Sequence, residues 1–242
     1  VWAEKDFENF KFSLLEQRQE KWPEWHLPSP FKRSALSDAV IFPEWFAGNW
    51  QVFSIDLDDD RKNYIQHMAR FKPDDLDRII ADRVFNTESL AREVLREELL
   101  YVKEDPNQQN RQLAVFKGEN YLETKVLSRE QQNNYSDIFL VDEIVMQIHH
   151  SPEITKINQV ETLGRYKQCN QSKNSLANNQ QSWICGEQWQ AVYKEPGQDF
   201  QSKPIYTNHY QLFFIPFNSK MSLENFLTHL SKGKALSNEG DL

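Results

Sequence analysis

Asp56, Asp58 and Asp60 are spaced like the first acidic ligands of a calcium-binding loop. Such loops combine carboxylates at alternate positions with a glycine at the sixth position and a bidentate glutamate at the twelfth. In this chain Arg61 stands at the sixth position and His67 at the twelfth. We therefore interpret the segment as an acidic hairpin turn between two strands.

His149, His150, Glu161 and Glu187 are further side chains suited to metal binding or acid–base chemistry. Adjacent residues of a strand point to opposite faces of a sheet, so the two imidazoles cannot hold one metal ion. Nothing in the sequence places the two glutamates in one cavity. Glycine-rich phosphate loops and the Gly-x-Ser-x-Gly and His-Glu-x-x-His motifs are absent from the sequence. We expect no metal ligands and name no catalytic residue.

Arg83, Glu161, Arg165 and Gln188 are our candidates for the polar groups of an internal ligand pocket. Glu161 and Arg165 are four residues apart in one expected strand, so they share a face about 13 Å apart and cannot pair directly. A buried charge without a partner is costly, so burial predicts partners from neighbouring elements. Arg83 is the partner that we predict for Glu161.

Cys169 and Cys185 flank a polar stretch that is typical of a loop between two strands. A hairpin of this shape brings the two sulfur atoms close enough for a disulfide in an oxidising compartment. Two unpaired thiols in a reducing compartment are the alternative, and the sequence leaves both open.

The composition limits the classes of protein to which the chain can belong. Its 242 residues suffice for one large β domain with appendages or for two small domains. Aromatic residues make up 13%, which argues against disorder. The net charge of −8 argues against nucleic-acid binding, and the sequence has no apolar run long enough for a transmembrane helix. The chain begins at Val1, as expected of a product whose targeting segment has been removed, and equally of a chain trimmed at that point.

The first 45 residues are expected to form a helix and a strap that pack on the main domain. Residues 6–22 have Phe10, Leu14 and Leu15 near helical spacing, with Asp6 as the N-cap. The following proline-rich stretch, residues 23–43, is expected to run extended over a surface and to bury its aromatic side chains.

Residues 46–220 are expected to form a mainly β domain, because apolar and polar residues alternate in runs separated by turns. The expected strands are 50–58, 64–71, 111–118, 120–129, 137–150, 154–169, 182–195 and 204–217. Closing such antiparallel strands into an up-and-down barrel removes the exposed sheet edges. A short inserted helix is expected at 87–97, and residues 79–85 before it are a candidate for a further strand. Residues 221–242 are expected to form a C-terminal helix over 221–232 and a mobile tail.

Gly48 and Trp50 resemble the Gly-x-Trp opening of lipocalin-like (calycin) barrels, which stands just before the first strand. The resemblance implies that glycine permits a tight turn and that Trp50 is buried at one end of the barrel, where it would border a ligand. The Asp-Tyr turn motif of lipocalins is missing, and the last expected strand has no arginine, so the resemblance extends to the barrel rather than to a classical lipocalin.

A second resemblance covers about residues 28–215. The chain is similar there to a family of cyanobacterial and plastid proteins that has no assigned activity. The segments that carry this resemblance are PSPFKRSALSDAVIFPEWFAGNW (28–50), ADRVFNTESLA (81–91), DPNQQNRQL (105–113), NQVETLGRYKQ (158–168) and EQWQAVY (187–193). It implies a photosynthetic source, a lipocalin-like fold and a location in the thylakoid lumen or periplasm after removal of a targeting segment.

Three functions remain open at this point. The first is a non-enzymatic binding protein that holds an apolar or amphiphilic molecule, such as a pigment, tetrapyrrole or lipid. The second is an assembly factor for photosynthetic membrane complexes that uses the aromatic strap. The third, and weakest, is a calycin-type chromophore lyase or isomerase. A barrel filled by its own side chains is the alternative to an internal pocket.

Overall fold

The computed structural model describes residues 13–31, 39–59, 63–134, 137–169, 183–194, 202–218 and Thr228. Helix α1 (Leu14–Glu20) lies within the helix expected over 6–22. Its N-cap is Ser13, whose hydroxyl accepts a hydrogen bond from the Glu16 amide while the Glu16 side chain accepts one from the Ser13 amide. The expected cap at Asp6, the tail and, apart from Thr228, the C-terminal helix lie outside the described residues.

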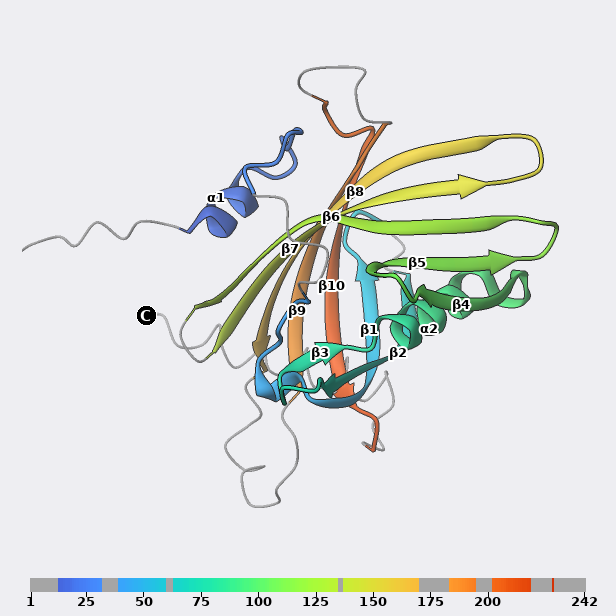
Figure 1. The fold of residues 1–242 in the computed structure, drawn as a ribbon. Helices are drawn as coiled ribbons and strands as arrows, with labels where there is room; N and C mark the ends of the chain where they lie inside the picture. The colour runs from blue at the N-terminus through green and yellow to red at the C-terminus, as the bar shows by residue number, and fades with distance from the viewer. Residues whose placement is uncertain are drawn as a thin grey trace, which may run out of the picture.

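The main domain is one antiparallel sheet of ten strands (Figure 1). The strands are β1 (Gly48–Asp56), β2 (Tyr64–Pro73), β3 (Ile79–Ala81), β4 (Leu99–Asp105), β5 (Gln108–Phe116), β6 (Tyr121–Asn134), β7 (Ile138–His150), β8 (Thr155–Gln168), β9 (Ile184–Tyr193) and β10 (Tyr206–Pro216). Their order in the sheet is β3-β2-β1-β10-β9-β8-β7-β6-β5-β4. The expected mainly β, antiparallel domain is confirmed. Strand β4 was not expected, because its charged sequence follows a helix without a turn signal.

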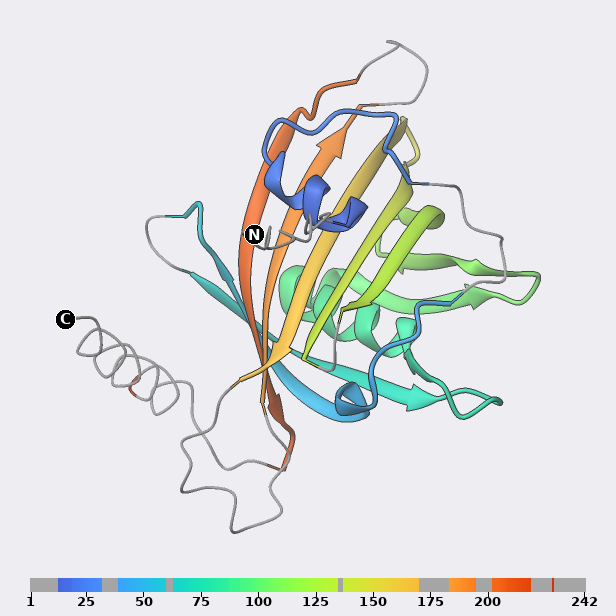
Figure 2. The ribbon, with the colours of Figure 1, turned by 90° about the vertical axis from the view of Figure 1, so that its left-hand side faces the viewer.

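The sheet is a curled half-barrel and not the fully closed barrel that the strand pattern suggested. The first and last strands pair, as closure requires, but β3 and β4 are its two free ends. Helix α2 (Arg83–Leu95) comes between them in the chain and lies in the hollow of the curled sheet (Figure 1). We call the face toward α2 the inner face and the opposite face, which carries α1, the outer face (Figure 2).

Side chains of helix α2 make some of the hydrogen bonds that a further strand would make to the edge of β2. The Asn86 side chain accepts a hydrogen bond from the Arg70 amide at 2.7 Å and donates one to the Arg70 carbonyl at 3.2 Å. The Ser89 hydroxyl accepts one from the Met68 amide at 2.8 Å. On the other side of the helix, Thr87 donates to the Gln112 side chain of β5. These bonds satisfy part of the edge of β2, which explains why the sheet is stable without complete closure.

An aromatic core fills one end of the inner face. Trp50 is fully buried there, as expected, and its indole donates to the Phe46 carbonyl at 2.7 Å. Gly48 has a φ of 123°, which explains the glycine of the Gly-x-Trp pattern. Tyr166 lies so close to Gly164 and Gly186 that a Cβ atom on either glycine would come within 2.5 Å of its ring.

Residues 23–31 of the strap and α1 cover the outer face, whereas Val40 and Phe42 of the strap pack on the inner face. Trp25 and Phe31 are buried with Leu15 of α1 against Leu163 of β8 and Trp189 of β9. The strap therefore buries its aromatic side chains, as its proline-rich sequence predicted.

Cys169 and Cys185 form a disulfide with a Cα–Cα distance of 5.4 Å. It links the end of β8 to β9 at the hairpin that the polar stretch predicted. Of the two alternatives left open by the sequence, the structure has the bridged pair.

Candidate ligand-binding site

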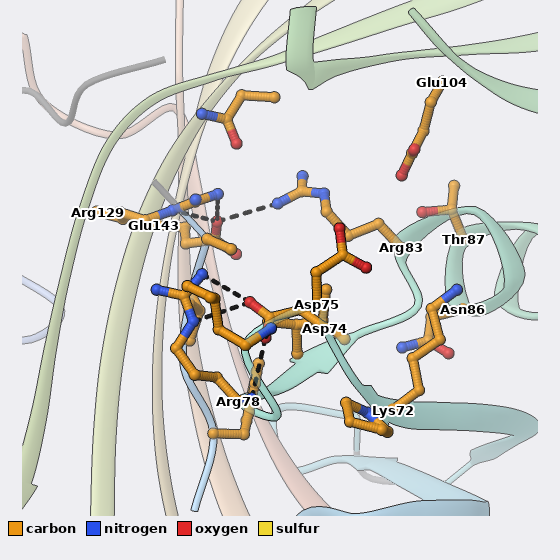
Figure 3. Close-up of a pocket in the computed structure, with 18 residues that line it drawn as sticks. Lys72, Asp74, Asp75, Arg78, Arg83, Asn86, Thr87, Glu104, Arg129 and Glu143 are labelled. Carbon is orange, nitrogen blue, oxygen red and sulfur yellow. Dashed lines mark hydrogen bonds and ion pairs between the residues drawn. The ribbon is translucent and has the colours of Figure 1, made fainter. Parts of the chain in front are cut away.

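A pocket of about 680 Å³ opens on the inner face beside the start of α2 (Figure 3). Its walls come from residues 39–42, the β2–β3 hairpin, the first turn of α2 and the strands β4 to β7. The pocket therefore lies at the gap in the sheet that α2 fills. Its size is within the range of about 300–1,000 Å³ that is usual for small-molecule sites.

Three charged side chains form one wall of the pocket. Arg129 of β6 and Arg83, the first residue of α2, approach Glu143 of β7 from two sides (Figure 3). Nη2 of Arg129 lies 2.7 Å from Oε1 of Glu143, and Nη1 of Arg83 lies 3.2 Å from the same oxygen. Burial by itself would raise the pKa of Glu143, but the two guanidinium charges outweigh it and hold the pKa below its usual value.

Apolar side chains form another part of the pocket lining. Val40 is buried, and Phe42, Ile80 and Ala81 are half-buried and line the same space. Phe42 packs edge-on against Phe71 of the aromatic core with ring centroids 4.7 Å apart. The aromatic core therefore holds Phe42 of the pocket lining in place. A molecule in the pocket would contact both apolar carbon atoms and charged groups.

The rim of the pocket carries exposed charges of both signs. Arg78 and Asp74 form an ion pair in the β2–β3 hairpin with an N–O distance of 2.6 Å. The hydrogen bond from Arg78, with further backbone hydrogen bonds, lowers the pKa of Asp74. Asp75 and Glu104 are exposed. Water screens such rim charges, so they bear less on a bound molecule than the charges of the wall.

Of the sequence-predicted site residues, Arg83 lines the pocket. Gln188 is half-buried on the inner face, opposite Gly164 of β8, but it does not line this space. Trp50 lies in the aromatic core and does not line it either. The sequence therefore placed one of its polar candidates at the pocket wall.

Glu161 and Arg165 are on the outer face, contrary to the prediction that they point into the barrel. Glu161 is fully buried beneath α1, where its partner is Arg18 at 2.7 Å and not the expected Arg83. Arg165 is exposed. Alternation correctly put the two residues on one face, but it does not tell which face of a strand is the inner one. Helix α1 supplies the cation that the prediction sought inside.

Arg129 and Glu143 are pocket residues that sequence reasoning missed. Glu143 stands between Val141 and Val145 on one face of β7, and a charge at such a position is a signal of a site. Arg129 gave no such signal, because a register shift between Val126 and Ser128 turns it toward the inner face.

The acidic turn and the histidine pair that the sequence also singled out lie in the strands and turns of the sheet and do not form a site. The Asp58 carboxylate accepts a hydrogen bond from the His209 amide at 2.9 Å, while Asp60 and Arg61 lie outside the described residues. His149 and His150 pair with adjacent residues of β6, so their side chains point to opposite faces as expected. Within the described ranges, no group of His, Cys, Asp and Glu side chains is arranged to hold a metal ion.

Neither helix in the described part of the chain has the length and apolar character that a membrane crossing requires. No curated protein and no solved structure matches the chain. Residues 55–217 match a family described as a domain of unknown function (DUF6816). This range includes Arg83, Arg129 and Glu143, whereas Arg18 and Trp50 precede it. Because this match covers more than half of the residues of the chain, the chain belongs to the DUF6816 family.

Proposed function

We propose that the protein is a non-enzymatic binding protein that holds one small amphiphilic molecule, such as a pigment, tetrapyrrole or lipid, in the pocket on its inner face. The pocket itself carries this proposal. It combines a volume in the range of small-molecule sites with both apolar and charged lining side chains, which suits an amphiphilic ligand.

The walls of the pocket are held in place before any ligand binds. Asn86 and Ser89 fix α2 to the edge of β2, and Asp82 caps the helix by accepting a hydrogen bond from the Phe85 amide. Asp82 also pairs with Lys72 at 3.0 Å. A preformed pocket supports binding because little conformational freedom is lost when the ligand enters.

The two alternative functions have less support. An assembly factor that docks through an aromatic strap needs exposed aromatic side chains, yet Trp25 and Phe31 are buried and Trp22 is half-buried. An enzyme needs a perturbed acid or base next to its substrate. In the pocket, the pKa of Glu143 is lowered by its two arginine partners, which makes this carboxylate a weak base. Asp142 is a buried carboxylate whose pKa is raised by burial and by the charge of Glu161, but it lies on the outer face beneath α1, away from the pocket.

We extend the proposal to fold relationship and location. Pairing of β1 with β10 and burial of Trp50 after Gly48 support a lipocalin-like origin of the half-barrel. The disulfide between Cys169 and Cys185 supports work in an oxidising compartment, for which we propose the thylakoid lumen or the periplasm.

Fluorescence titration with N-phenyl-1-naphthylamine, a neutral apolar probe, tests the binding function. We expect saturable binding of one probe per chain. Thr87→Phe narrows the pocket from α2 and should weaken binding about tenfold or more, since it takes away room and contact surface from the probe. Thr155→Phe makes the same exchange at an exposed site of β8 and should leave binding unchanged. Absence of saturable binding, or equal binding by the Thr87→Phe variant, would contradict the proposal.

A further inference from the structure

A buried cluster of charged side chains lies beneath α1, on the outer face of the sheet. Arg18, Glu161 and Asp142 are all buried there. Asp142 of β7 pairs in register with Leu163 of β8, which packs against α1, and its charge interacts with those of Glu161 and Arg18. Neither carboxylate oxygen of Asp142 has a hydrogen-bond partner among the described residues. The cluster therefore holds two carboxyl groups and one guanidinium, and the second carboxyl group is unsatisfied.

Ionisation of Asp142 would place a second negative charge in this buried cluster. Arg18 makes its two shortest hydrogen bonds to Glu161, which also accepts one from Tyr193 of β9. The single charge of Arg18 can balance only one of the two carboxylates. Burial and the charge of Glu161 accordingly raise the pKa of Asp142, although Arg18 opposes the shift. A buried charge without a partner destabilises the conformation that buries it.

The other charged groups around Asp142 do not supply a second buried cation. Glu130 lies opposite it on β6 and is exposed, and Glu143 follows it on β7 but faces the pocket. Glu16 of α1 accepts a hydrogen bond from the Ser13 amide. The remaining groups on the surrounding elements are exposed, namely Glu20 and Lys21 of α1, Glu24 and His26 of the strap and Arg165 of β8.

Helix α1 and the strap as far as Phe31, which we call the outer cover, add no strand to the sheet (Figure 2). An isolated bridge joins Leu27 of the cover to Ser202. Within the cover, the Trp25 indole donates to the Arg18 carbonyl at 2.6 Å. Strands β7, β8 and β9 are each paired on both sides. The cover can therefore open while the sheet stays folded, because local opening involves segments with few backbone hydrogen bonds to the rest of the chain.

His209 of β10 makes a second contact with the cover that is stronger when the imidazole is protonated. Its ring stacks on Trp189 of β9 and lies against Trp22 of the cover, with centroid distances of 5.1 Å and 5.4 Å. Its Nε2 atom lies 3.4 Å from a carboxylate oxygen of Glu187. A protonated imidazole gains attraction from both indoles and from this carboxylate. Acid therefore favours the closed cover at this contact as well.

We propose that the outer cover is a pH-dependent lid, which is closed in acid and opens as Asp142 loses its proton. Opening lets water reach the carboxylates of Asp142 and Glu161, and it uncovers the apolar side chains of Leu140, Leu163 and Trp189. The lid lies on the face opposite to the pocket, so it is independent of the binding function proposed above.

Hydrogen exchange of the whole chain between about pH 5 and pH 8 tests the lid. The Gln17 amide, bonded to the Ser13 carbonyl, and the Leu27 amide, bonded to the Ser202 carbonyl, report on the cover. Exchange is expressed as protection relative to an unstructured peptide at the same pH. We expect protection of both amides to fall by up to about tenfold per pH unit, since opening releases one proton. The paired amides of β8 should keep their protection.

Three variants assign the effect to a side chain. Asp142→Asn cannot ionise and should hold the protection of the cover constant with pH. Arg165→Gln changes an exposed charge on the same face and should behave like the wild type. His209→Gln should keep most of the fall in protection.

Each alternative outcome overturns a stated part of the proposal. Wild-type protection of the cover that does not change with pH, or an equal fall at the amides of β8, would show that there is no local lid. This comparison needs no variant, so it decides the matter even if Asp142→Asn does not fold. A fall that persists in Asp142→Asn and disappears in His209→Gln would assign the lid to His209 and overturn the role of Asp142.

Discussion

Arg18 and Glu161 are 143 positions apart in the sequence and form a buried two-point ion pair. Nε and Nη2 of Arg18 each donate to one carboxylate oxygen of Glu161 at 2.7 Å. Tyr193 donates its hydroxyl to the same carboxylate at 2.8 Å, and burial followed by the charge of Glu161 raises the pKa of Tyr193, so that it stays a donor. The pair ties α1 to strands β8 and β9.

Removing one partner of this pair should strongly destabilise the protein. Glu161→Gln leaves the charge of Arg18 buried without a counter-charge, so we expect a loss of about 3–5 kcal/mol in the free energy of unfolding. Arg18→Met should lose a similar amount, while the double change Arg18→Met with Glu161→Leu should recover most of it. Urea unfolding of the four proteins measures these values. A Glu161→Gln variant as stable as the wild type would show that the pair does not anchor α1.

Asp142 should make the protein less stable as the pH rises. Its side chain is fully buried next to Glu161 and Arg18, and neither carboxylate oxygen has a hydrogen-bond partner among the described residues. Burial, followed by the charge of Glu161, raises its pKa well above the usual value. The folded state therefore binds a proton that the unfolded state releases above a pH of about 4.

The raised pKa of Asp142 sets the direction in which stability changes with pH. Stability from protonated Asp142 is complete below a pH of about 4 and is lost as the pH rises toward the raised pKa of the folded state. Asp142→Asn cannot lose a proton, so its stability relative to the wild type should increase with pH over this range. Thermal unfolding between about pH 4 and pH 8 measures the difference. A constant difference across this range would show that Asp142 titrates normally.

The sequence could predict the elements that depend on local pattern. Alternation and turn residues predicted most of the strands. The polar stretch between Cys169 and Cys185 predicted the hairpin, and the structure decided between a disulfide and two free thiols. The positive φ of Gly48 is a local demand of the chain, whereas the burial of Trp50 was expected from the resemblance to the Gly-x-Trp opening of lipocalin-like barrels.

The pairings that form the pocket and the ion pair beneath α1 could not be predicted, because they depend on packing across the sheet. The partner of Glu161 comes from a helix on the outer face, and the direction of Arg129 depends on a register shift in β6. Neither leaves a periodic signal in the sequence. The prediction of a fully closed barrel was also wrong. Side chains of α2 such as Asn86 form part of the hydrogen bonds that a closing strand would make to β2.

Asn86 should be important for the edge of β2. Asn86→Ala removes both of its hydrogen bonds to the Arg70 backbone, and we expect a loss of about 1–3 kcal/mol because these part-buried groups are left unpaired. Hydrogen exchange at the Arg70 amide should accelerate in the same variant. Glu88→Ala is the matched control on α2, since it breaks only an exposed pair with Arg92. Unaltered exchange at Arg70 would indicate that α2 does not hold this edge.

The disulfide between Cys169 and Cys185 should stabilise the chain by closing its loop. With a sequence separation of 16, the entropy of closure corresponds to about 3 kcal/mol. Changing both cysteines to serine should lower the melting temperature by the same amount as adding a reductant to the wild type. The double variant should then be insensitive to reductant. A wild-type protein that melts at one temperature with and without reductant would contradict the expected contribution.

Trp50 should contribute both volume and a hydrogen bond to the aromatic core. Its side chain is fully buried, packs edge-on to Phe214, and donates to the Phe46 carbonyl at 2.7 Å. Trp50→Ala should cost about 3–5 kcal/mol because it leaves a large cavity. Trp50→Phe keeps most of the apolar contact and leaves the carbonyl without its donor, so the cost should be about 1–3 kcal/mol. Urea unfolding ranks the two variants. Equal losses would mean that the indole hydrogen bond, and not the volume, is what the core requires of this residue.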